Sequence, residues 1–118
     1  MAKFRFEDLE IWKLAIEIGM KIIDIADKMK ELKLYRFIDQ ARGVGMSMSN
    51  NIAESTGTNQ VGEQRQLLRY ARRECFEAVN ILIILQLSKI ITEEELDLLK
   101  AKIETSSQKI NNYSNSLK

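Results

Sequence analysis

The chain has 118 residues, of which 45% are hydrophobic and 30% are charged, and its net charge is +1. This composition is typical of a single globular domain, residues 1–118, and excludes a disordered chain. A net charge this close to zero creates no global field that favours a nucleic-acid or membrane partner, so any basic site must be a local patch. Abundant Leu, Ile, Glu and Lys, with no proline, favour an all-helical fold.

The chain contains no histidine, which limits the chemistry that it can perform. Ser-His-Asp and Cys-His nucleophiles, the Glu-x-x-His pairs of di-iron bundles and an ordinary catalytic zinc site are all excluded. No glycine-rich phosphate loop occurs either. We therefore predict a protein that is not an enzyme and that uses no cofactor and no metal.

The single cysteine, Cys75, cannot form a disulfide within the chain, and we interpret it as a small buried hydrophobic residue. The first residues carry charges throughout and lack the apolar core of a signal peptide. No run reaches the roughly 18 apolar residues that a membrane span requires. We expect a cytoplasmic protein without a membrane partner.

The first predicted helix covers residues 7–29, and its apolar residues form two heptad-spaced seams. One seam is Leu9, Trp12, Ile16, Gly19, Ile23 and Ala26, and the other is Ile11, Ala15, Ile18, Ile22, Ile25 and Met29. Together they cover an arc of about 200°, wider than a helix at the edge of a monomeric bundle needs. The extra width suggests contacts both inside and outside the subunit.

The second predicted helix, residues 35–55, is unusual because its polar stripe consists of weak helix formers such as Gly, Ser and Asn. We hypothesise that this stripe packs against protein, with small residues allowing close approach and polar side chains forming hydrogen bonds. The candidate polar interface is Gln40, Arg42, Ser47, Asn51, Glu54 and Glu77. The alternative is a solvated face whose weak propensity is tolerated because of tertiary packing.

The third predicted helix, residues 61–87, changes character along its length. Its second half is apolar nearly all round, which indicates a buried segment. A capping box at 92–95 then starts a fourth helix that extends to about Tyr113. Four helices with short connections predict an all-α, antiparallel up-and-down four-helix bundle.

The first half of the third helix carries a cluster of arginines within about 100° of arc, namely Arg65, Arg69, Arg72 and Arg73. Repeated around a ring, they would form a basic belt that could hold the phosphates of RNA or DNA. Solvated or salt-bridged arginines are the alternative, which Glu63, Glu74, Glu77 and the small net charge favour.

Three sequence marks resemble the four-helix-bundle proteins named for 23S rRNA intervening sequences, over almost the whole chain. The first is Phe6, Leu9, Ile11, Trp12 and Ala15; the central one is Gln40, Arg42, Ser47, Asn51, Ile52, Ala53 and Glu54; the third is Leu67, Leu68, Ala71 and Glu77. The chain departs from the family pattern where Ser49 replaces Pro, Ser55 replaces Gly, Gly43 replaces Arg, and Arg73 and Glu74 replace Gly-Ser. The corner between the second and third helices is therefore expected to differ in detail.

This resemblance implies a ring-forming subunit, typically a homopentamer, and no enzymatic activity. Some members of the family are encoded inside insertions of the large-subunit rRNA gene, which is a gene location and proves no ribosomal role. The family is also similar in shape to basic ring proteins that assist diversity-generating retroelements and engage a reverse transcriptase and nucleic acid. We therefore predict a non-enzymatic, self-assembling scaffold or accessory protein whose partner is another copy of itself. The alternative is a ring that binds RNA or DNA.

Overall fold

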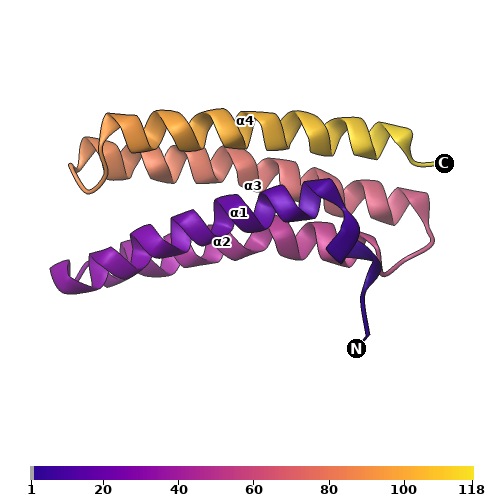
Figure 1. Cartoon of the computed structure of the whole chain (residues 1–118), viewed down its shortest axis with the longest axis horizontal. Coiled ribbons are helices and arrows are strands. Elements are labelled where there is room, and N and C mark those ends of the chain that lie inside the picture. Colours follow the sequence, from indigo (N-terminus) through magenta and orange to yellow (C-terminus); the bar gives the residue numbers. More distant parts are fainter. Residues whose placement is uncertain (1) are drawn as a thin grey trace.

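A computed structural model describes residues 2–118, which form four α-helices: α1 (Glu10–Lys28), α2 (Tyr35–Ser55), α3 (Val61–Leu87) and α4 (Glu93–Ser116). Two short 3₁₀ turns, η1 (Arg5–Asp8) and η2 (Met29–Leu32), flank α1. Consecutive helices run antiparallel, and both chain ends lie at the end of the bundle where α3 begins (Figure 1). The described residues contain no strand, so the predicted all-α, up-and-down bundle is confirmed.

The helix boundaries match the predicted ranges in the middle of the chain and differ at its ends. The prediction that the first helix begins at Glu7 is wrong, because Leu9 is extended (φ −74°, ψ 127°) and separates η1 from α1. The predicted capping box is confirmed: the Glu95 amide donates to Thr92 Oγ1 (3.1 Å), and the Thr92 amide donates to Glu95 Oε1 (3.2 Å). This cap fixes the start of α4, which ends three residues later than predicted.

The bundle is least tightly closed between α1 and α4. Extensive contacts join α1 to α2, α2 to α3 and α3 to α4, whereas the contact between α1 and α4 is smaller. Two ion pairs bridge this seam, Glu10 with Lys109 and Glu17 with Lys102. The acids lie seven residues apart on α1 and the lysines seven residues apart on α4, so the two ion pairs lie along one face of each helix. None of the helices described combines the length and the apolar character required to cross a bilayer.

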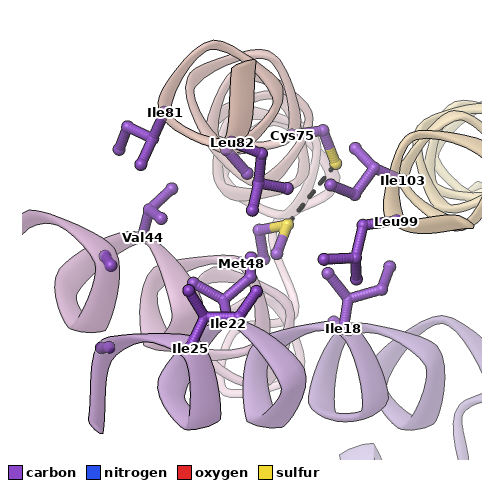
Figure 2. Close-up of a cluster of buried hydrophobic side chains, with 14 of the residues drawn as sticks. Ile18, Ile22, Ile25, Val44, Met48, Cys75, Ile81, Leu82, Leu99 and Ile103 are labelled. Carbon is purple, nitrogen blue, oxygen red and sulfur yellow. Dashed lines mark hydrogen bonds between the residues drawn. The ribbon is translucent and has the colours of Figure 1, made fainter. Parts of the chain in front are cut away.

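The core is a layer of aliphatic side chains contributed by all four helices (Figure 2). Cys75 is 1% exposed, and its thiol donates to the Met48 sulfur at 3.7 Å. Burial raises the pKa of the Cys75 thiol to about 11, which keeps it protonated and unreactive at neutral pH. The interpretation of Cys75 as a small buried hydrophobic residue is confirmed.

Helices α1 and α2 touch backbone to backbone at a pair of glycines. A Cβ atom built on Gly19 would lie 2.1 Å from the Gly45 carbonyl oxygen, and one built on Gly45 would lie 3.0 Å from the Gly19 carbonyl oxygen. The close approach expected along the small residues of α2 therefore occurs at Gly45, inside the subunit. A Cβ atom on Gly43 meets nothing within 4 Å.

The second half of α3 is less buried than its apolar sequence predicts. Ile81, Leu82 and Leu85 are buried as expected. Ile84 is 39% exposed and Leu87 is 72% exposed. The prediction of a segment buried on all sides is therefore wrong for the single subunit, because α3 packs mainly against α2 and α4, and two helices cannot surround it.

Candidate interaction surfaces

The predicted polar stripe of α2 borders a groove between α2 and α3. Ser47 Oγ donates to Glu74 Oε2 at 2.8 Å and so joins the two helices, while Asn51 Nδ2 donates to the Ser47 carbonyl oxygen at 2.9 Å within α2. The groove has a volume of about 500 Å³, and its lining is Asn51, Tyr70, Arg73, Glu74 and Glu77. We call it the α2–α3 polar groove.

The remaining residues of the candidate polar interface do not join this contact. Gln40 and Glu54 are exposed, and Arg42 forms an ion pair with Asp27 on α1. That ion pair lowers the pKa of Asp27, chiefly through the hydrogen bond from Arg42. Within residues 2–118 the six side chains therefore form no single network, and their role between copies stays a prediction.

Glu74 is the contact residue that sequence reasoning left out of the candidate polar interface, because it was treated as a departure from the family pattern and as a counter-charge to the arginines. It occupies the position where the family has a small residue, and there it accepts the hydrogen bond from Ser47 that joins α2 to α3. The available signal was its spacing: Glu74 lies one helical turn before Glu77 and shares its side of α3. The pKa of Glu77 is raised. The largest cause is its hydrogen bond with Glu74, followed by partial desolvation and then by charge repulsion from Glu74.

We expect Glu77→Gln to raise the free energy of unfolding at pH 7 by roughly 0.3 kcal/mol, since it removes repulsion between like charges on one helix surface. The pKa of Glu77 is raised in the folded state, so between its unfolded value near 4.5 and that higher value the folded chain binds more protons. Wild-type stability therefore falls as the pH rises through this window. Urea unfolding of both proteins at pH 7 and pH 4 checks the prediction, and an equal gain at both pH values would contradict it.

The structure divides the predicted arginine cluster between two grooves. Arg65, Arg69 and Arg72 line a groove of about 330 Å³ between α3 and α4, together with Leu68, Ile110, Asn111, Ser114 and Asn115. Arg73 instead lies in the α2–α3 polar groove beside Glu74 and Glu77. The four arginines thus do not line one groove within the subunit.

Hydrogen bonds to α4 position two of the three groove arginines. Arg65 donates to the carbonyl oxygens of Ser114 (3.3 Å) and Leu117 (2.9 Å). Arg72 donates to Ser107 Oγ and Asn111 Oδ1, both at 3.3 Å. Arg69 reaches only its helix neighbour Gln66, so it is held less firmly than the other two.

An apolar surface continues along α3 beyond the arginines, and we call it the α3 apolar face. It consists of Phe76, Val79, Ile83, Ile84 and Leu87, of which Phe76 is 65% exposed. Part of it borders a second α3–α4 groove, of about 440 Å³, with Cys75 and Ile103 among the lining residues. Lys100 and Glu104 line the same groove, so charged side chains border an apolar centre.

A second apolar surface covers the outer side of the α1–α2 pair, and we call it the α1–α2 apolar face. Its residues are Ile16, Met20, Ile23 and Met46; Met20 is 52% exposed and Met46 is 50% exposed. Met20 follows Gly19 and Met46 follows Gly45, the two glycines at which α1 and α2 touch. Because the two helices are antiparallel, the residue after the contact projects to the same side of the pair in each helix, and here that is the outer side. Ile16 and Ile23 are half-buried, and both belong to the wide apolar arc from which an external contact of the first helix was predicted.

The comparisons with known proteins are consistent with this fold. The family model described as 23S rRNA-intervening sequence protein matches residues 7–112, which includes all of α1, α2 and α3 and most of α4. No curated protein and no solved structure matches the chain. The family match covers the three sequence marks on which the resemblance was based, except Phe6, which lies one residue before it. The chain therefore belongs to the 23S rRNA-intervening sequence protein family.

Proposed function

We propose that this protein is a non-enzymatic, cytoplasmic, self-assembling scaffold or accessory subunit whose copies join through the two apolar faces. The observation that carries the proposal is the α3 apolar face, where Phe76 and Leu87 are 65% and 72% exposed. Contiguous apolar patches on soluble proteins mark interaction sites, whereas scattered apolar residues need no explanation. Five apolar residues cluster within about three turns of one helix, interrupted by the exposed Asn80.

A second copy of the chain is the occupant that we propose for the α3 apolar face. The chain itself provides a complementary surface, the α1–α2 apolar face, and α1–α2 and α3–α4 form opposite sides of the bundle. When two different faces on opposite sides of a subunit meet, the contact is heterologous, and such contacts generate a closed ring if the rotation between subunits permits. The resemblance to ring-forming relatives supports closure, and we propose a homopentamer on that basis.

The α2–α3 polar groove lies next to these apolar faces and is suited to the rim of such an interface. Interfaces typically surround an apolar centre with polar, solvent-accessible residues. Asn51 and Glu77 border the groove and can form hydrogen bonds with a neighbouring copy. In this arrangement the polar stripe of α2 forms hydrogen bonds between subunits, as predicted, although its residues do not form a network within a single subunit.

Native mass spectrometry of the full chain, with light scattering over a range of concentrations, tests the proposal. We expect one discrete oligomer, with five copies as the proposed number, and little free subunit at micromolar concentration. A symmetric dimer would overturn the heterologous arrangement. A folded monomer at the highest concentrations would overturn self-assembly, because both apolar faces would then be stable in water.

A further inference from the structure

Two segments that carry basic residues and no acid lie at one end of a chain that is almost neutral overall. Residues 64–73 contain four arginines and no acid, and residues 105–118 contain two lysines and no acid. The rest of the chain is therefore net negative, because the net charge is only +1. Since α3 and α4 are antiparallel, the start of α3 lies beside the end of α4, and the two positive segments meet (Figure 1).

The groove formed where these segments meet contains cationic and neutral polar groups but no carboxylate. Arg65, Arg69 and Arg72 line its α3 side, and Asn111, Ser114 and Asn115 line its α4 side. Glu63, two residues before Arg65, accepts from Thr58 at the α2–α3 corner, and Glu10 pairs with Lys109 of α4. The positive charge of the groove is therefore not neutralised from within.

The arginines retain donors for a ligand. A guanidinium has five N–H groups, and the bonds from Arg65 and Arg72 to α4 use two from each. These bonds hold both guanidinium groups in the groove, which reduces the entropy lost when a ligand binds. Arg69 lies between them along the helix and has only the bond to Gln66.

We propose that this α3–α4 groove binds the phosphodiester backbone of a single nucleic-acid strand. Arginine and side-chain amide and hydroxyl donors are the groups that contact phosphates and sugars. Arg65 and Arg72 are seven residues apart, or about 10 Å along the helix. Over this length each of the three arginines can contact one phosphate of the same strand.

The surroundings favour a nucleic-acid backbone over an acidic protein and over base recognition. A protein interface needs an apolar centre, which lies further along α3, whereas Leu68 and Ile110 in this groove are buried beneath polar side chains. None of its lining residues is aromatic, so there is no platform for stacking bases. Binding is therefore independent of sequence and sensitive to salt.

Fluorescence anisotropy with a labelled single-stranded RNA of about eight nucleotides, short enough to occupy one site, tests the proposal. With three phosphates contacted, the slope of log K against log salt should be about −2, because each contact contributes about −0.7 on single strands. Arg69→Gln should weaken binding several-fold and make the slope shallower by about 0.7. Light scattering on the variant should give the wild-type oligomer, so this result does not depend on the proposed scaffold function.

Arg73→Gln is the matched control, since it makes the same change one helical turn away but in the α2–α3 polar groove. It should leave affinity and slope close to wild type. Equal losses for Arg69→Gln and Arg73→Gln, salt-independent binding, or no binding at about 50 mM salt would overturn the proposal. Complete displacement of the RNA by inorganic phosphate at matched ionic strength would also overturn it, because the site would then hold a lone phosphate.

Discussion

Gly19→Ala is expected to lower the free energy of unfolding by about 3 kcal/mol or more, the upper range for overpacked cores. The new methyl carbon would lie 2.1 Å from the Gly45 carbonyl oxygen and 3.2 Å from its carbon. Both are backbone atoms in the middle of α2, so no side-chain rotation can relieve the clash. Helices α1 and α2 would have to separate along their length, which would also loosen the core around Ile18 and Ile22.

Gly43→Ala provides the matched control for this prediction. Gly43 is also a helical glycine, and a Cβ atom there meets nothing within 4 Å. Alanine should therefore raise the free energy of unfolding by about 0.5–1 kcal/mol through helix propensity alone. Urea unfolding monitored by circular dichroism measures both variants. Similar changes in the two variants would show that the glycine contact is not what limits the approach of α1 and α2.

The sequence was sufficient to predict which residues form α2 and α3, because their apolar periodicity is long and their boundaries are well marked. The stretch 56–60 lacks an apolar repeat and separates the two helices where the structure has the turn. Thr92 and Glu95 predicted the start of α4 because a capping box is a local signal. The start of α1 was misplaced, since nothing in residues 5–9 distinguishes a 3₁₀ turn from the first turn of an α-helix.

The contact between Gly19 and Gly45 could not be predicted from helix patterns. Gly19 was assigned to an apolar seam of the first helix, yet the register between two helices depends on how all their side chains pack together. The same limitation applies to the arginines. A helical wheel places Arg69 and Arg73 about 40° apart, but only the positions of α2 and α4 decide that the first lines a groove with Asn115 and the second lines one with Asn51.

The double variant Phe76→Glu, Leu87→Glu is expected to dissociate the proposed oligomer into folded subunits. Burying a Phe or Leu side chain contributes about 1.5–3 kcal/mol, and a carboxylate in its place must also be desolvated. A loss of about 3–6 kcal/mol per interface weakens association by about 100-fold to 10,000-fold. Because both side chains are exposed in the subunit, its own stability should hardly change.

Leu98→Glu is the matched control, because Leu98 is 66% exposed but lies in the α1–α4 groove, outside both apolar faces. It should leave the oligomer intact. Native mass spectrometry gives the copy number of each variant, and circular dichroism verifies that the subunits are folded. If the double variant keeps the wild-type copy number, the α3 apolar face is not the interface.

Mixing two variants shows whether the faces meet each other or meet themselves. Met20→Glu, Met46→Glu should dissociate the oligomer just as the α3 double variant does, because each heterologous contact needs one face of each kind. In an equimolar mixture, one variant still has an intact α1–α2 apolar face and the other an intact α3 apolar face. A single interface can then form, and it cannot propagate. The mixture should therefore give a heterodimer and nothing larger, whereas self-paired α3 faces would leave the methionine variant a homodimer and the mixture without heterodimer.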